Sequence, residues 1–481
     1  MKKIWFILGS ALSMFGCGSN EIPVPPPTPP ENSGTISVWR TQADASVKLI
    51  REAQKLAWED SGNSDVFISI DEAEIRQEME GFGAALTGSA AFVLMNYLDV
   101  SERSAVLEDL FDPEKGIGLS VLRLTIGASD FSTQTYSYHD LSNGTQDENL
   151  EQFSISPEQQ HLIPVLKEIL AIAPDLTLIA SPWSAPGWMK DTGTMSGGGS
   201  LKPAHYDSYA LYFVKYLQAM ADAGIDIQYL TIQNEPLHEA GYPTMYMSAV
   251  AQASFIKDHL GPALGQAGLT TEIIIYDHNW DRIDYPLDIL ADPVAKSQVA
   301  GTAFHCYGGN VDDMSIVHEA HPEIGIFFTE CSGGDFSPNF GDNLAWNAEQ
   351  LLIGNTRNWA KTVLFWNLAL NEQHGPKNGG CQDCRGVLTI NSQSGSVNQE
   401  VEYFLLGHLS KFVRPGAHVM GTPNVRNQGI SQVAFRNTDG SWALLAFNHQ
   451  NSAQEIMVEM NGETFSYNIQ ARNLVTFHWQ E

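Results

Sequence analysis

The chain has 481 residues, enough for two or three domains of ordinary size or for one large barrel with an attachment. Hydrophobic residues make up 43% and aromatic residues 10%, which excludes a mainly disordered chain. There are 26 Lys and Arg against 56 Asp and Glu, a formal net charge of −30. Such an acidic surface repels nucleic-acid phosphates and anionic lipid headgroups. We therefore expect no nucleic-acid partner and favour a neutral substrate such as a sugar.

The first residues have the pattern of an export signal. Two lysines precede a short apolar run, residues 4–15, which is too brief to span a bilayer and ends at Gly16-Cys17. This resembles a bacterial lipoprotein signal, so we expect a signal peptide at 1–16 and a lipid on Cys17. Secretion with Cys17 removed is the alternative. Residues 17–34 are rich in proline and predict an extended linker. Both interpretations place the protein outside the cytoplasm. Only a lipid on Cys17 would attach it to a membrane.

Four further cysteines remain in the chain. Cys381 and Cys384 could be half of a zinc site, but no second pair of ligands lies nearby in the sequence. In an oxidising compartment a short disulfide that pins a loop is the favoured interpretation. For Cys331 we expect a buried thiol. We expect no metal and no cofactor.

The central part of the chain alternates short apolar runs with longer amphipathic stretches. This order is typical of a parallel sheet with helical crossovers, and eight such units predict a closed (β/α)8 TIM barrel. The expected strands are residues 81–84, 120–126, 176–181, 228–233, 272–276, 301–305, 325–329 and 362–367.

Both flanks of this region have the alternation of β-strands. After Pro415-Gly416 there are four such runs, with Asp439-Gly440 and Asn461-Gly462 as hairpin turns. Two more runs precede the barrel, and pairing the two sets would remove their open edges. We therefore expect a β-sandwich side domain built from both ends of the chain. The expected boundaries are 35–78 for its N-terminal strands, 79–411 for the barrel and 412–481 for its C-terminal strands.

Function in a TIM barrel is located at the carboxyl ends of the strands. Two carboxylates, Glu235 and Glu330, directly follow apolar runs at the ends of strands four and seven. A lone Glu in such a place is more often an ion-pair or capping residue. Here both side chains face one rim, and tryptophans are available on neighbouring strands. Paired carboxylates in an aromatic-lined cleft are what glycosidic cleavage requires, one as a proton donor and one as a nucleophile.

Several motifs then resemble glycoside hydrolase family 30, in the same order along the chain. They are Glu80-Gly81-Phe82-Gly83-Ala84-Ala85-Leu86-Thr87, Arg123-Leu124-Thr125-Ile126-Gly127, Ala180-Ser181-Pro182-Trp183-Ser184-Ala185-Pro186, Gln233-Asn234-Glu235-Pro236, Phe304-His305-Cys306-Tyr307 and Phe328-Thr329-Glu330-Cys331. The resemblance runs from about residue 36 to the C-terminus. It implies a retaining β-glycosidase with the barrel and sandwich inferred above.

The resemblance also implies roles for individual residues. Glu235 matches the acid/base and Glu330 the nucleophile, with Arg123 beneath the nucleophile. Asn234 would bind the sugar 2-hydroxyl. The remaining matches are Asp130, Trp183 and Trp366 as residues that hold glucose, Tyr307 as a residue that steers the nucleophile, and His305 as one that shapes the pocket or is merely structural. The family often has an acidic residue after the threonine of its first motif, whereas Gly88 follows Thr87 here.

Local features favour one branch of the family. Residues 198–203, 234–238 and 379–386 resemble the endo-β-1,6-glucanase group, and the last of these is expected to form a pinned loop at the cleft. We therefore predict an endo-β-1,6-glucanase acting on β-glucan. A glucosylceramidase or β-glucosidase is the alternative within the family, because either would hold glucose beside the carboxylates. A surface glycan-binding lipoprotein without catalysis is the alternative of another class.

Overall fold

The computed structural model describes residues 34–58, 64–142 and 145–480. The expected signal peptide, the lipidation site at Cys17 and nearly all of the proline-rich linker lie outside these described residues. Among the described residues, no helix combines the length and apolar character that a membrane crossing requires.

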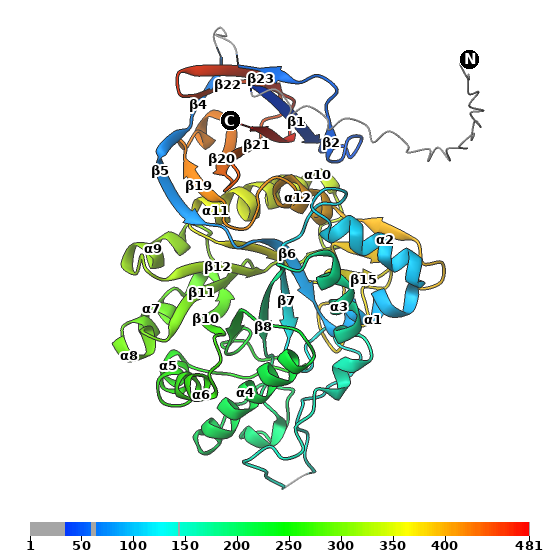
Figure 1. Cartoon of the computed structure of the whole chain (residues 1–481), viewed down its shortest axis with the longest axis vertical. Coiled ribbons are helices and arrows are strands. Elements are labelled where there is room, and N and C mark those ends of the chain that lie inside the picture. Colours follow the sequence, from blue (N-terminus) through cyan, green and yellow to red (C-terminus); the bar gives the residue numbers. More distant parts are fainter. Residues whose placement is uncertain (1–33, 59–63, 143–144, 481) are drawn as a thin grey trace, which may run out of the picture.

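The predicted TIM barrel is confirmed (Figure 1). Its eight strands are parallel, and all eight predicted runs contribute one. They are β6 (Gly81–Leu86), β7 (Val121–Thr125), β8 (Thr177–Ser181), β9 (Tyr229–Thr231), β10 (Glu272–Asn279), β11 (Val299–His305), β12 (Gly325–Glu330) and β14 (Thr362–Phe365). The ladder runs in chain order from β6 to β12, and β14 pairs with β6. An isolated bridge between Ile326 and Ala360 brings the two ends together.

Helices surround this sheet. They are α1 (Gly88–Tyr97), α2 (Val100–Phe111), α3 (Leu162–Ile172), α4 (Tyr206–Asp222), α5 (Ala249–Phe255), α6 (Gly261–Ala267), α7 (Asp284–Leu290), α8 (Pro293–Lys296), α9 (Asp313–Ala320), α10 (Phe340–Trp346), α11 (Asn355–Arg357) and α12 (Val401–Ser410). The π-helical segments η4 (Ile256–Leu260) and η6 (Asn347–Gly354) join α5 to α6 and α10 to α11. Asp99 caps α2 in a reciprocal capping box with Glu102, which satisfies two backbone donors at its start.

The sandwich predicted from both chain ends is also confirmed (Figure 1). One sheet has the order β2 (Ile50–Arg51), β1 (Thr35–Thr41), β24 (Leu474–Gln480), β21 (Ser441–Asn448), β20 (Ile430–Arg436), β19 (His418–Gly421) and β5 (Asp71–Glu78), with β3 (Leu56–Ala57) beside β1. The other sheet has the order β23 (Glu463–Ile469), β22 (Gln454–Met460) and β4 (Val66–Ser69). The N-terminal strand β1 lies against the C-terminal strand β24, so neither has an open edge there.

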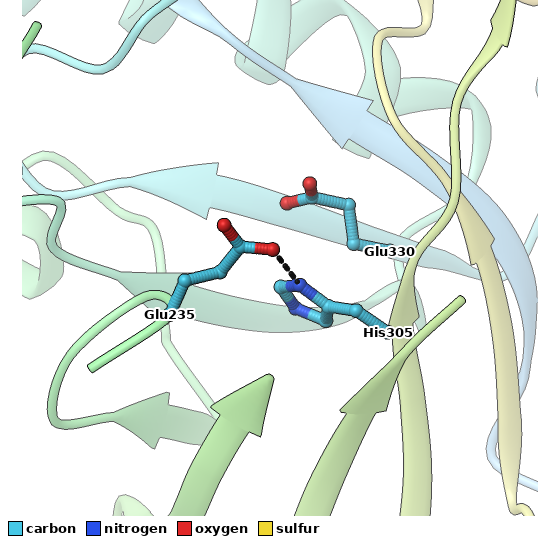
Figure 2. A group of neighbouring side chains, drawn as sticks. All are labelled: Glu235, His305 and Glu330. Atoms are coloured by element: carbon cyan, nitrogen blue, oxygen red, sulfur yellow. Dashed lines mark hydrogen bonds and ion pairs between the residues drawn. The ribbon is translucent and has the colours of Figure 1, made fainter. Parts of the chain in front are cut away.

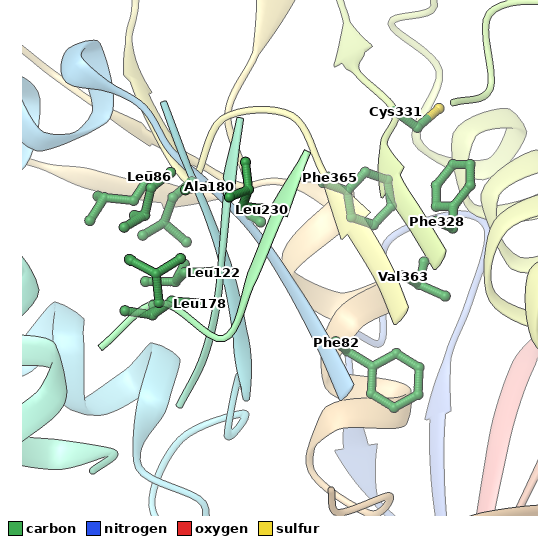
Figure 3. Packing of buried hydrophobic residues seen from close by; sticks show 14 of the residues in the cluster. Phe82, Leu86, Leu122, Leu178, Ala180, Leu230, Phe328, Cys331, Val363 and Phe365 are labelled. Carbon is green, nitrogen blue, oxygen red and sulfur yellow. The ribbon is translucent and has the colours of Figure 1, made fainter. Parts of the chain in front are cut away.

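Alternation along the barrel strands determines where the site lies. Outward-facing residues such as Phe82, Leu122 and Leu230 pack in the large core cluster that includes the surrounding helices (Figure 3). Inward-facing residues form a separate apolar layer, which consists of Val121, Ile179, Ile274, Ala303, Phe327 and Leu364. Because side chains repeat every second residue, the next inward positions are Arg123, Ser181, His305, Thr329 and Trp366. A polar layer therefore lies directly above an apolar one, toward the carboxyl ends of the strands.

Candidate active site

The two predicted carboxylates meet across one pocket at the carboxyl ends of the strands. Glu235 follows β9 and Glu330 ends β12, and Figure 2 shows their carboxyl groups facing each other above His305. One oxygen of each glutamate and a ring nitrogen of His305 all lie within 4.8 Å of one another. The pocket has a volume of about 590 Å³, in the range of small-molecule sites.

Glu330 is held on both of its oxygens. Nη1 of the Arg123 guanidinium donates to Oε2, and the hydroxyl of Tyr307 donates to Oε1 over 2.9 Å. Burial and the nearby charge of Glu235 raise the pKa of Glu330, while the charges of His305 and Arg123 oppose this rise. The carboxylate therefore has a fixed orientation and a cationic neighbour.

Arg123 is itself completely buried, at 0% exposure. Its guanidinium lies 4.9 Å from the ring centroid of Trp183 and 5.6 Å from that of Trp366, within cation–π range. Its Nη2 donates to Asn234 Oδ1 and to Asp277 Oδ2, each over 2.7 Å. Arg123 thus contacts both the nucleophile candidate Glu330 and the residue beside Glu235, Asn234.

Asp277 is the centre of the polar layer, a role that the sequence did not predict. Besides Arg123, its carboxylate accepts hydrogen bonds from four groups: Ser181, Thr231, Thr329 and His305, at 2.7 to 3.0 Å. Burial by itself would raise the pKa of Asp277. The charge of Arg123 and the hydrogen bonds from His305 and Thr329 outweigh burial and hold that pKa well below its usual range.

His305 connects this buried charge to Glu235. Its Nε2 lies 3.0 Å from Asp277 Oδ1 and its Nδ1 lies 3.0 Å from Glu235 Oε1. Burial lowers the pKa of His305, but the charges and hydrogen bonds of Glu330, Asp277 and Glu235 raise it to about 9. In return His305 lowers the pKa of Glu235 against the effect of burial. The two side chains therefore share one proton along a single hydrogen bond.

The backbone is bent at these positions. Glu235, Asp277 and Asn367 all have positive φ, at 45°, 62° and 69°, although none is glycine. Such conformations cost roughly 1–3 kcal/mol each and are found mainly at functional sites. The N–H of Glu235 donates to the carbonyl of Asp277 over 2.9 Å, so the two bends support each other.

Two tryptophans and an aspartate form another part of the pocket wall. The rings of Trp183 and Trp366 stack with centroids 4.9 Å apart, and both are almost fully buried. Asp130 lies beside them, and its Oδ1 has no hydrogen-bond partner among the described residues. Burial and the charges of Glu330 and Glu235 raise the pKa of Asp130. The backbone at Gly380 approaches Asp130 closely. A Cβ added at Gly380 would lie 2.7 Å from Asp130 Oδ2.

Two disulfides border the pocket. Cys381 is joined to Cys384, the first residue of β16 (Cys384–Arg385), and β16 pairs with β13 (Gly333–Gly334). Cys306 is joined to Cys331. The expectation of a buried thiol at Cys331 is therefore wrong: the residue is buried, but the neighbouring exit of β11 brings Cys306 within bonding distance.

The donor set of Glu235, His305 and Glu330 is the only group among the described residues with the spacing of a metal site. Both oxygens of Glu330 already accept hydrogen bonds, and both ring nitrogens of His305 are engaged. The arrangement therefore suits proton transfer between fixed partners better than metal binding.

The predicted catalytic and substrate-binding residues all lie in or directly beneath this pocket. The prediction missed Asp277, although it directly follows an apolar strand just as Glu330 does. It also missed Phe336 and Trp346, which follow β12 and line the pocket. No sequence periodicity distinguishes these two from ordinary surface aromatic residues.

The chain is similar to known proteins over most of its length. The model of the glycosyl hydrolase family 30 TIM-barrel domain matches residues 79–413, and that of the family's β-sandwich domain matches residues 416–477. The endo-1,6-beta-D-glucanase neg1 of Aspergillus fumigatus is 35% identical over 84% of this chain and 85% of its own length. A putative glucosylceramidase of Caenorhabditis elegans is 31% identical over 86% of this chain and 82% of its own.

A solved structure is similar over nearly the whole chain. The endo-beta1,6-glucanase BT3312 superposes with a TM-score of 0.87 at 35% identity, covering 93% of this chain and 100% of that one. The fold, the paired carboxylates and these matches agree, and the chain belongs to glycosyl hydrolase family 30, a family of retaining glycoside hydrolases.

Proposed function

We propose that this protein is an endo-β-1,6-glucanase that cleaves β-glucan by double displacement. The observation that carries the proposal is the facing pair of Glu235 and Glu330, with carboxyl oxygens within 4.8 Å. Retaining glycosidases hold their two carboxyl groups roughly 5–5.5 Å apart, whereas inverting enzymes leave room for a water between them.

In the first step, Glu330 attacks the anomeric carbon and Glu235 donates a proton to the departing oxygen. The hydrogen bonds from Arg123 and Tyr307 aim the carboxylate of Glu330 at that carbon. The proton comes from the pair formed by His305 and Glu235, since movement from Nδ1 to Oε1 places it on the carboxyl group. In the second step, Glu235 removes a proton from water, and that water releases the sugar from Glu330.

The glucosyl unit that reacts would lie against Trp183, Trp366 and Asp130. Indole faces bind the apolar faces of sugar rings, and the unpartnered Oδ1 of Asp130 is available to a sugar hydroxyl. Asn234 has its amide oxygen fixed by Arg123, which leaves its NH₂ group for the 2-hydroxyl. That hydrogen bond would strengthen in the oxocarbenium-like transition state.

The choice of β-1,6-glucan rests on the relatives. Endo-1,6-beta-D-glucanases of Aspergillus fumigatus and Neurospora crassa are 35% and 36% identical to this chain, compared with 31% for the glucosylceramidase of Caenorhabditis elegans. The disulfide-bonded loop at Cys381 and Cys384, which resembles that group, also borders the pocket.

A hydrolysis screen tests the substrate. Pustulan, laminarin, xylan, glucosylceramide and an aryl β-glucoside are each incubated with the enzyme, and reducing sugar or released aglycone is measured. Oligosaccharides from pustulan are expected. Cleavage of glucosylceramide alone would instead identify a lipid hydrolase, and no cleavage of any substrate would indicate a binding protein.

Two variants test the mechanism. Glu330→Gln should abolish turnover while the protein stays folded. Glu235→Gln should lose activity on pustulan but still form a glycosyl-enzyme from a substrate with an activated leaving group, and azide should rescue its turnover as the β-glucosyl azide. Near wild-type activity of Glu330→Gln would show that the nucleophile is assigned wrongly.

We propose that the protein acts outside the reducing cytosol, and its two disulfides support this, because such bonds persist in oxidising compartments. We further propose that Cys17 is lipidated and that residues 17–34 hold the enzyme away from a membrane. Mass spectrometry of the mature N-terminus tests this: an acylated Cys17 supports the anchor, and an N-terminus beyond Cys17 contradicts it.

A further inference from the structure

The pocket has a second, exposed set of aromatic side chains that the reaction described above does not use. Phe336 and Trp346 line the same pocket as Trp183 and Trp366. The last two are 2% and 3% exposed, whereas Phe336 is 58% and Trp346 45% exposed. Exposed aromatic residues that line the same pocket are typical of ligand-binding grooves.

The order of strands around the barrel shows which part of a substrate would meet these residues. Glu235 follows β9 and Glu330 ends β12. In one direction between them lie β8, β7, β6 and β14, with the glucose-holding residues of the proposed function. In the other direction lie β10 and β11, and the exit of β12 leads to Phe336 and Trp346. The leaving group would depart on this second side, because the first is filled by the reacting sugar.

Both aromatic residues are held in place by ordered structure. Phe336 follows β13, which pairs with β16 beside the disulfide of Cys381 and Cys384. The N–H of Asp335 donates to the carbonyl of Asp383 over 2.8 Å, which fixes the residue before Phe336. Trp346 ends α10, and Asn343 and Asn347 on the same helical face also line the pocket. A rigid aromatic face beside amide groups is suited to a sugar ring.

A second cavity adjoins the active-site pocket at Trp346. It has a volume of about 450 Å³ and shares Cys306 and Trp346 with the active-site pocket. Its lining is mostly polar and comes from the loop after β11, from η6 and from the sandwich, and it includes Asn310, Gln350 and Asn424. The side chain of Gln350 makes no hydrogen bond to another described residue. A polar cavity that continues from an exposed tryptophan suits a hydroxyl-rich chain.

We propose that Phe336 and Trp346 form a platform for the glucosyl unit on the leaving-group side, and that the second cavity binds the units beyond it. This inference rests on the proposed β-glucan substrate. It explains how a pocket with a closed aromatic wall behind the reacting sugar could take a polymer, because the leaving-group part of the chain would extend past Trp346 toward the sandwich.

The test compares substrates with and without a sugar on the leaving-group side. Trp346→Ala should lower kcat/KM on pustulan about tenfold, the loss expected for one stacked aromatic contact. The same variant should hydrolyse β-glucosyl fluoride, whose leaving group is a single atom, within about twofold of wild type. Phe67→Ala is the matched control, since this residue of β4 in the sandwich is 49% exposed and lines neither cavity.

The second cavity is tested with β-1,6-linked oligosaccharides of increasing length. In the wild-type enzyme kcat/KM should rise with chain length, and in Gln350→Ala this rise should stop at a shorter chain while short substrates react normally. The platform is overturned if Trp346→Ala leaves pustulan hydrolysis unchanged, or if it lowers fluoride and pustulan hydrolysis equally. A wild-type enzyme that cleaves β-glucosyl fluoride but no β-1,6-glucan would instead overturn the proposed substrate and the inference with it.

Discussion

Arg123 and Asp277 form an ion pair at the base of the active site, with 2.7 Å between Nη2 and Oδ2 and both side chains at 0% exposure. Two charges so deeply buried need further hydrogen bonds to offset their desolvation. Here the remaining bonds lead to Glu330 through Arg123 and to Glu235 through His305. The ion pair is thus the common support of both candidate catalytic carboxylates.

Asp277→Asn should therefore impair catalysis although Asp277 is not expected to touch the substrate. The variant keeps the shape of the side chain but removes one of the charges that hold His305 protonated. We expect kcat to fall by at least about a hundredfold, the lower end of what a positioned proton donor contributes. Steady-state kinetics and circular dichroism of the folded variant check this. Asp284→Asn, which breaks only an exposed pair with Arg282, should have little effect on either.

The pH dependence of the reaction should reveal the shared proton. The pKa of His305 is raised to about 9, so the proton shared with Glu235 is present below that pH and is lost as the pH rises through it. Because the first step consumes this proton, kcat/KM should fall above about pH 9. In His305→Asn only Glu235 would hold the proton, and the alkaline limb should move to lower pH. An unchanged or higher limb would rule out the shared proton, and His259→Asn at an exposed pair with Asp207 is the control.

The disulfide between Cys306 and Cys331 should matter for turnover. The paired register of β11 and β12 ends at His305 and Glu330, so this bond holds the strand exits together just beyond the ladder. The double variant Cys306→Ser/Cys331→Ser should lower kcat about tenfold, since small displacements of reacting groups are costly. It should also lose about 2–4 kcal/mol of stability. Thermal unfolding and kcat are measured together.

The second disulfide gives a comparison. Cys381→Ser/Cys384→Ser loosens the loop that presses on Asp130, so it should raise KM more than it lowers kcat. If the two double variants changed kcat and KM in the same proportion, the disulfides would have only a general structural role.

Gly380→Ala tests the close approach of that loop to Asp130. The added Cβ would lie 2.7 to 2.9 Å from three atoms of Asp130, so one of the two segments must move. We expect kcat/KM on pustulan to fall about tenfold, comparable to the loss of one charged hydrogen bond. Gly265→Ala is the matched control, because a Cβ there meets nothing within 4 Å and the residue lies in α6. Equal kinetics of the two variants would mean that Asp130 needs no such support.

The sequence by itself determined the barrel, the sandwich and the two facing glutamates. Buried strands are recognisable because most residues are apolar or small over a short run, and the sandwich strands because they alternate. Glu235 and Glu330 could be placed because the carboxyl ends of parallel strands converge at one edge. The tryptophans were found at the ends of neighbouring strands, and the role of Arg123 came from a motif that resembles the family's.

Only the tertiary structure decided the role of Asp277. Counting by two from Ile274 points Tyr276 inward and Asp277 outward. However, β10 has a register shift against β11 between Tyr276 and His278, and both Tyr276 and Asp277 have positive φ. This irregularity turns Asp277 into the barrel, where it becomes the central acceptor.

The partners of Cys306 and the platform of Phe336 and Trp346 were likewise beyond the sequence. Cys306 and Cys331 lie 25 residues apart, and only the lateral pairing of β11 with β12 brings them together. Phe336 and Trp346 follow no repeat, and their placement depends on the small ladder between β13 and β16 and on α10. Local patterns encode which strands form, because burial and alternation act over a few residues. The leaving-group side is built from contacts between loops distant in sequence, and these exist only once the barrel has closed.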